Sequence, residues 1–312
     1  MMNVVFTSSI SYYKYMMVTI DSLFLYEDPT SIHIYVITER KFPDLQKKIS
    51  RYIQSRGSKI SFIVPNEQLF INFKHTKSSR ATHSKFIYSR LFLNKILPKN
   101  IDRCILFGAD VFIRNSIDEF YNADFEDKAI VACYDTNAFR NIVVHKNLDW
   151  EGNAGRGKSF FNDDVVLFNL DKFRELNISE NTYNEYIFSY CPYNSTQGLL
   201  NWLLCVKNNL VKYLPPYIYN SFPIVHELFE QYGKDNGIII DPKIVQFVVN
   251  RPWDSFFNNS LSYYDEWWNI AKQSLLYPEI LEEVLVDQYL NKIKTIPTDR
   301  KSTRLNSDLT IQ

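Results

Sequence analysis

Short β-rich runs alternate with helical periodicity along the first third of the chain. Asn3 to Thr7 reads as a strand, and apolar residues then recur at helical spacing from Met16 to Phe24. A second strand is expected at Ile32 to Ile37, a helix opened by proline at Pro43 to Ser55, and a third strand at Lys59 to Val64. This alternation predicts an α/β domain with a parallel, doubly wound sheet and right-handed crossovers.

The next strand ends at the most informative junction in the sequence. Ser84 to Ile96 is amphipathic and predicts a helix that ends before Pro98, after which Arg103 to Phe107 predicts a buried strand. The strand leads directly into Gly108-Ala109-Asp110. Ligands of open α/β sheets bind beyond the carboxyl ends of the strands, so Asp110 is well placed for chemistry. An Asp that caps the following turn is the alternative interpretation.

The second half of the chain continues with strands and then helices. Strands are expected at Ala129 to Tyr134 and Val165 to Asn169, separated by a polar, Gly-rich segment from Asn147 to Lys158 that predicts a mobile loop able to serve as a lid. Helices are expected at Gln197 to Asn208 and Tyr263 to Leu290. We therefore expect a main domain over residues 1–258, a helical extension over 259–296 and a disordered tail over 297–312.

Composition narrows the class of protein. The 312 residues contain 46% hydrophobic residues, enough for a full core, and 35 basic residues balance 35 acidic ones. Without a global positive field, nucleic acid is not an expected partner. The four cysteines have no framework spacing and no stretch reaches the roughly 18 apolar residues of a membrane span, so we expect a cytoplasmic protein. A peripheral contact with the inner face of a membrane stays open.

Several short motifs occur in a definite order along the chain. They are Val4-Val5-Phe6-Thr7-Ser8 followed by Tyr12, Tyr88-Ser89-Arg90-Leu91, Ile105 to Ile113, Phe160-Phe161-Asn162 with Val165 to Leu170, Gln197 with Leu199-Leu200-Asn201, Arg251-Pro252-Trp253, and Tyr264 to Ile280. Each is unspecific alone, but their order and spacing resemble the family 8 glycosyltransferases. These are retaining enzymes of the GT-A fold, with a Rossmann-like mixed sheet, that transfer a sugar from a nucleotide donor, usually a UDP-sugar. The resemblance spans roughly residues 3 to 281.

The resemblance implies roles for particular positions. The implied donor-binding residues are Thr7, Ser8, Tyr12, Arg90, Gly108, Ala109, Asp110, Asn162, Asp163 and Arg251. Gln197 and Asp135 are implied on the catalytic and acceptor side, and Asp110 and Gln246 occupy the metal-binding positions. We place Asp164 on the catalytic side as a hypothesis of our own, because the family usually has small residues there. Mn²⁺ or Mg²⁺ is the implied cofactor.

Departures from the family pattern fall on these same positions. The first carboxylate of the family's D-x-D turn is replaced by Gly108, and its distal metal-binding histidine is replaced by Gln246, a poorer ligand. The family's D-Q-D segment reads Thr196-Gln197-Gly198, without its two carboxylates. We expect weak metal dependence unless the lost ligands are replaced.

Two kinds of compensation are conceivable. Preorganised cations could stabilise a diphosphate leaving group without a metal, and Arg90, Lys85 and Arg251 are the candidates. Alternatively, a carboxylate has moved to Asp163-Asp164, where the family usually has small residues. For Lys85 and Asp163, a solvated surface charge is an equally good interpretation.

The aromatic C-terminal helix also has two interpretations. Trp267, Trp268, Tyr263 and Tyr264 could rest at a bilayer interface and bring the site to a lipid-linked acceptor. The simpler interpretation is that they pack the helix onto the sheet, because no basic cluster accompanies them.

The sequence thus favours a bacterial glycosyltransferase. It would transfer a hexose from UDP-glucose or UDP-galactose to a saccharide or lipid-linked acceptor, as in the synthesis of lipopolysaccharide or capsule. The alternative is a degenerate, non-catalytic relative that binds a nucleotide sugar or a partner enzyme. An unrelated nucleotide-binding enzyme is disfavoured because the chain has neither a G-x-G-x-x-G motif nor a P-loop.

Overall fold

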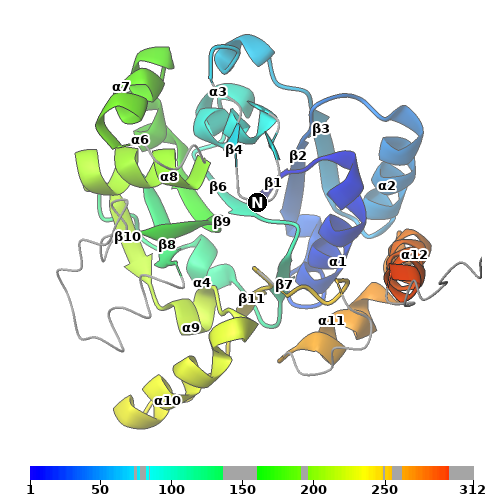
Figure 1. The fold of residues 1–312 in the computed structure, drawn as a ribbon. Coiled ribbons are helices and arrows are strands. Elements are labelled where there is room, and N and C mark those ends of the chain that lie inside the picture. Colours follow the sequence, from blue (N-terminus) through cyan, green and yellow to red (C-terminus); the bar gives the residue numbers. More distant parts are fainter. Residues whose placement is uncertain are drawn as a thin grey trace, which may run out of the picture.

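A seven-stranded sheet runs through the centre of the computed structural model, in the order β10-β8-β9-β6-β1-β2-β3 (Figure 1). The structure describes residues 1–73, 76–77, 82–83, 85–135, 160–190, 196–248, 250–254 and 262–294. The strands of the central sheet are β1 Met2–Thr7, β2 Ile32–Ile37, β3 Lys59–Ile63, β6 Arg103–Phe107, β8 Ile130–Tyr134, β9 Phe161–Asn169 and β10 Val211–Leu214. Two small antiparallel pairs add β7 Val111–Ile113 with β11 Ile244–Gln246, and β4 Thr76–Lys77 with β5 Thr82–His83.

The central sheet is mixed, as the family resemblance implied. Strand β9 runs antiparallel to both β6 and β8, whereas the other neighbouring strands are parallel. The parallel arrangement predicted from the alternation of elements is present at β6, β1, β2 and β3, and it does not extend to β9. A parallel β9 would need a crossover, usually helical, and the polar sequence from Asn147 to Lys158 does not have helical periodicity. That segment, with the lid expected there, lies outside the described residues.

Strand β9 also begins earlier than predicted, at Phe161 instead of Val165. Backbone pairing with β8 continues to Tyr134, which lies opposite Phe161, with an irregular register after Ala132. Asn162, Asp163 and Asp164 consequently lie on a strand of the central sheet.

Helices cover both faces of this sheet (Figure 1). The α-helices are α1 Tyr13–Leu23, α2 Pro43–Ser55, α3 Leu93–Ile96, α4 Asp118–Tyr121, α6 Leu170–Glu175, α7 Glu180–Tyr190, α8 Thr196–Asn201, α9 Pro216–Tyr219, α10 His226–Asn236, α11 Tyr264–Ala271 and α12 Tyr277–Lys294. The helix predicted at Ser84 to Ile96 is a 3₁₀-helix over Lys85–Phe92 followed by α3, and the one predicted at Gln197 to Asn208 is α8 followed by a π-helix over Trp202–Lys207.

Strand β1 shows how the core is divided. Val5 packs into one hydrophobic cluster, whereas Val4 and Phe6 pack into another, as the alternation of side chains along a strand requires. All three are buried, so helices and loops must cover both faces. The carboxyl end of the strand is left for polar contacts, and the site lies there.

The C-terminal helices share a third cluster with α1. Trp267 and Trp268 are buried in it with Tyr15 and Val18, and the indole Nε1 of Trp268 donates a hydrogen bond to the carbonyl oxygen of Pro252 (3.2 Å). Packing therefore accounts for these tryptophans, and they are not available to a bilayer interface. No helix within the described ranges is both long and apolar enough to cross a membrane.

A buried carboxylate ties α1 to α2 and makes stability depend on pH. Asp21 accepts a hydrogen bond from the hydroxyl of Tyr52 (2.6 Å), and burial raises the pKa of Asp21 to about 6, opposed by the hydrogen bond from Tyr52. A raised folded-state pKa means that stability falls as pH rises from the unfolded pKa of 3.8 through 6.

We expect the variant Asp21→Asn to gain stability over wild type as the pH rises from 4 to 8, by about 3 kcal/mol, because it has no charge to bury. Urea unfolding at several pH values would measure the difference. Asp102→Asn, at an exposed position, is the matched control. A difference that does not change with pH would show that Asp21 is not the group responsible.

Candidate functional site

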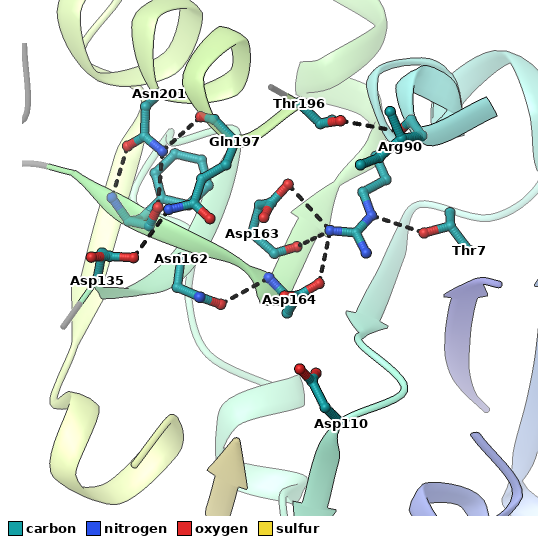
Figure 2. Close-up of polar contacts among 12 residues, drawn as sticks. Thr7, Arg90, Asp110, Asp135, Asn162, Asp163, Asp164, Thr196, Gln197 and Asn201 are labelled. Carbon is teal, nitrogen blue, oxygen red and sulfur yellow. Dashed lines mark hydrogen bonds and ion pairs between the residues drawn. The ribbon is translucent and has the colours of Figure 1, made fainter. Parts of the chain in front are cut away.

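Polar side chains gather where β1, β6 and β9 present their ends to one side of the sheet (Figure 2). Strand β6 stops at Phe107, and Gly108-Ala109-Asp110 then leads into β7. The next strand in the sheet, β9, brings Asp163 and Asp164 to the same place, because the amide of Gly108 donates to the carbonyl oxygen of Asp164 (2.8 Å). The site is thus built from segments more than fifty residues apart.

Arg90 organises one side of this site. From the 3₁₀-helix Lys85–Phe92, its Nη1 lies 3.2 Å from a carboxylate oxygen of Asp163 and 2.8 Å from one of Asp164 (Figure 2). Its Nε donates to the hydroxyl of Thr7 at the end of β1 (2.8 Å). Burial lowers the pKa of Arg90, but Asp164 and Asp163 outweigh it and raise the pKa above its usual value. Arg90 is therefore a charged, fully engaged side chain.

Burial raises the pKa of two carboxyl groups of the site, Asp110 and Asp163. Burial, followed by the neighbouring charge of Asp164, raises the pKa of Asp110 to about 7, although Arg251 opposes this shift. Burial also raises the pKa of Asp163 to about 6, with Arg90 opposing. The solvated surface interpretation of Asp163 was wrong, since the residue is only 5% exposed. Ionised carboxylates in this cluster destabilise the folded protein, and an added cation would reduce that destabilisation.

Position 108 has no room for a side chain. A Cβ on Gly108 would lie 2.8 Å from Oδ1 of Asp110 and 3.0 Å from both Cβ and Cγ of Asp164. Contacts under 3.0 Å force a neighbour to move, and here the neighbours belong to the acidic cluster itself. The side chain of Asp164 thus lies in the space that a side chain at 108 would enter.

Gln246 lies between the two carboxylates. It ends β11, whose antiparallel pairing with β7 sets Gln246 opposite Val111, and it is completely buried. Its Nε2 donates to Oδ2 of Asp164 (2.9 Å) and Oδ1 of Asp110 (3.4 Å), whereas its buried Oε1 has no hydrogen-bond partner in the described part of the chain. Among the described residues, no three His, Cys, Asp or Glu side chains form a metal-binding group.

The other two candidate cations differ in position. Nε of Arg251 lies 3.9 Å from Oδ2 of Asp110, at the rim of the acidic cluster. Lys85 is turned elsewhere, because its ammonium group donates to the carbonyl oxygen of Ile71 (2.5 Å). With Arg90 engaged by two carboxylates and Lys85 turned away, Arg251 is the one of these three cations placed to meet a diphosphate.

A second polar group lies at the start of β9, on the far side of Asn162. Nε2 of Gln197, on α8, donates to Oδ2 of Asp135 (3.1 Å), which directly follows β8 (Figure 2). Asn201, one turn further along α8, accepts from the amide of Phe161 (2.7 Å) and donates to its carbonyl oxygen (2.9 Å). Helix α8 is therefore fixed to β9, and it holds Gln197 over the strand.

Asn162 connects the two groups, and its partner was missed in the sequence. Oδ1 of Asn162 accepts from the amide of Asp164 (2.9 Å) and from Nδ2 of Asn220 (3.3 Å). Asn220 is completely buried, and its Oδ1 has no hydrogen-bond partner among the residues that the structure describes. Its only sequence signal is one amide within the aromatic run that follows Pro216.

The remaining expected donor-binding residues flank this centre. Ser8 is buried after β1, where its amide donates to the carbonyl oxygen of Ile37 (3.0 Å). Tyr12 is 39% exposed and packs edge-on against Tyr15. Ala109 lies between the second and third hydrophobic clusters. Of these three, Tyr12 offers the most accessible surface to a ligand.

Comparisons with known proteins agree with one another. The family model described as Glycosyl transferase family 8 matches residues 3–255. A Haemophilus influenzae protein named "Putative glycosyltransferase" is 29% identical over 222 residues, which is 69% of this chain and 64% of that protein's length. The fold is similar to that of the galactosyltransferase LgtC, solved with donor and acceptor sugar analogues (TM-score 0.69, 20% identity, 88% of this chain and 96% of that one). It is also similar to the glycosyltransferase GlyE of Streptococcus pneumoniae (TM-score 0.58, 16% identity, 92% and 64%).

Proposed function

This chain belongs to glycosyl transferase family 8, and we propose on that premise that it transfers a hexose from a UDP-sugar to a glycan acceptor, with retention of anomeric configuration. The single observation that carries the proposal is the convergence of Asp110, Asp164 and Arg90 beyond the carboxyl end of β6. In sheets of this kind that edge is where nucleotide ligands bind. We propose a UDP-sugar as the ligand because the chain belongs to family 8 and has the GT-A fold.

The donor would lie across this edge with its diphosphate toward Asp110. Arg251, 31% exposed in its side chain and at the rim, is the guanidinium group with room to contact a phosphate. Tyr12 and Ser8 lie at the end of β1, where the nucleoside would be held. A bound Mn²⁺ or Mg²⁺ would supply positive charge against the diphosphate leaving group.

The transferred sugar would face the group around Gln197. Asp135 fixes the amide of Gln197 through the 3.1 Å hydrogen bond, and Asn162 and Asn220 add a hydrogen-bonded pair of buried amide groups at the start of β9. Amide oxygens and nitrogens placed together suit hydroxyl groups, which both donate and accept hydrogen bonds. We assign sugar recognition to these residues and acceptor binding to the side of Asp135.

The proposed setting is the cytoplasmic synthesis of a surface glycan, with UDP-glucose or UDP-galactose as donor and a saccharide or lipid-linked precursor, of lipopolysaccharide or capsule, as acceptor. Reduced, buried thiols at Cys104 and Cys133 agree with a reducing compartment.

Thermal unfolding in the presence of nucleotides tests the donor site. We expect UDP and its hexose conjugates, with Mn²⁺, to stabilise the native protein by about 2.7 kcal/mol at a hundredfold excess over Kd, whereas GDP-mannose at the same concentration does not. Release of UDP in the presence of oligosaccharide acceptors would then measure transfer. If no nucleotide sugar raises the melting temperature, the proposal fails and a non-catalytic, partner-binding relative is the better account.

A further inference from the structure

We infer that Asp164, Asp110 and the amide oxygen of Gln246 form a divalent-cation site, in which a carboxylate from β9 replaces the one missing at position 108. The inference deepens the proposed function and rests on it for the donor that would share the cation. It makes Asp164 a metal ligand, whereas the hypothesis from the sequence placed it on the catalytic side.

The first argument is one of space. A side chain at 108 and the side chain of Asp164 compete for the same volume, since a Cβ at 108 would come within 3.0 Å of Cβ and Cγ of Asp164. The antiparallel pairing of β6 with β9 continues to Gly108, whose amide donates to the carbonyl oxygen of Asp164. Gly108 and the carboxylate at 164 are therefore one arrangement: the glycine leaves the space and the aspartate fills it.

The second argument is the unsatisfied amide. Gln246 is completely buried and directed between Asp110 and Asp164, and among the described residues its Oε1 has no hydrogen-bond partner. One amide atom stays unpartnered in either orientation of this side chain, so the orientation depends on what faces the two carboxylates. Without a cation Nε2 faces them, whereas a cation there would favour the rotated amide, in which Oε1 joins the two carboxylates as a third oxygen ligand. Carboxylate and amide oxygens are the ligands that Mg²⁺ and Mn²⁺ prefer.

The third argument is charge. Within the described part of the chain, the carboxylates of Asp110, Asp163 and Asp164 face only the guanidinium groups of Arg90 and Arg251 here. A donor diphosphate would add further negative charge to a cluster that already has a negative excess. A divalent cation reverses that balance, so the same residues that repel a free diphosphate would bind one with its metal.

Mn²⁺ binding, followed by electron paramagnetic resonance of the purified full chain with and without UDP, tests the site apart from activity. We expect wild type to bind one Mn²⁺ and the isosteric variant Asp164→Asn to bind it at least about tenfold more weakly. Asp135→Asn is the matched control, because its carboxylate lies on the sugar side of Asn162 and should leave Mn²⁺ affinity unchanged.

A carboxylate exchange sharpens the test. Gly108→Asp alone should lower the melting temperature, because its side chain overlaps Asp164. Combining Gly108→Asp with Asp164→Gly removes the overlap with Asp164 and returns a carboxylate to the same space, so the double variant should melt at a higher temperature than Gly108→Asp alone and should recover most of the Mn²⁺ affinity.

Two results would overturn the inference: no Mn²⁺ binding to wild type with or without UDP, or unchanged affinity in folded Asp164→Asn. Stabilisation by UDP in EDTA together with either result would leave the donor-binding proposal standing. A third result is Mn²⁺ binding that depends on Asp164 in a protein that no nucleotide stabilises. This result would support the cation site and contradict the proposed function.

Discussion

Replacing Arg90 with methionine should lower the free energy of unfolding by about 3–5 kcal/mol at pH 8, because it leaves two carboxylates without their buried cation. Nη1 of Arg90 contacts both Asp163 and Asp164, and the Arg90 side chain is only 11% exposed. Methionine keeps much of the buried volume, so the loss is mainly electrostatic. Urea unfolding followed by circular dichroism would measure it.

The loss of unfolding free energy in Arg90→Met should become smaller as the pH falls toward 5. Arg90 opposes the upward shift of the Asp163 pKa, so without Arg90 that pKa lies still further above 3.8. A group with a raised folded-state pKa loses its stabilising contribution as the pH rises through that pKa, so the variant is penalised most in alkaline solution.

Lys48→Met is the matched control, because Lys48 forms an exposed ion pair with Glu279 and should contribute less than about 1 kcal/mol. Equal losses in the two variants, or a loss in Arg90→Met that does not depend on pH, would contradict the structural role given to Arg90.

The N-terminal half of the fold was largely predictable, because local patterns determine it. Pro43–Ser55 was predicted to the residue, as Pro43 fixes the first turn and apolar residues recur on one face. Strand β6 was equally clear from its apolar run and the following Gly108. Strand β9 was harder, because Asn162, Asp163 and Asp164 follow its first residue, and such polar residues are buried in a strand only when non-local partners bind them.

The sequence predicted which residues form the candidate site better than it predicted the contacts between them. The sequence placed Asp110, Gln246 and Asp164 near one ligand but left open how they compensate for Gly108. That answer depends on the register between β6 and β9, which brings Asp164 opposite Gly108, and register between strands so far apart is not readable from residue types. Asn220 was missed for a similar reason, since its contact with Asn162 joins β9 to a distant loop.

The structure also alters what a restoration experiment would mean. Returning the family pattern with Gly108→Asp and Gln246→His looks like a repair from sequence alone. In the folded protein that aspartate would meet Asp164, already in the same space. The substitution at 108 is therefore tied to position 164, and only the exchange of both positions tests the idea cleanly.

Asp110→Asn should reduce kcat/KM for sugar transfer by about a hundred- to a thousandfold while leaving the fold intact. Asp110 follows β6 directly and contacts Gln246 and Arg251, so it is the carboxylate nearest to where we place the donor diphosphate. Asparagine keeps its shape but removes the charge that would hold the cation. Rates of UDP release with a saturating acceptor would measure the loss.

The stability of Asp110→Asn should not fall along with its activity. Burial raises the pKa of Asp110 to about 7, above its unfolded value of 3.8, so its contribution to stability is present at low pH and lost as the pH rises through 7. At pH 8 and without metal, Asp110→Asn should therefore be at least as stable as wild type, although it is inactive. Asp118→Asn, an exposed control on α4, should leave both properties unchanged. An Asp110→Asn variant that keeps more than about a tenth of wild-type activity would remove Asp110 from the donor site, since so small a loss does not fit a group that holds charge against a leaving diphosphate.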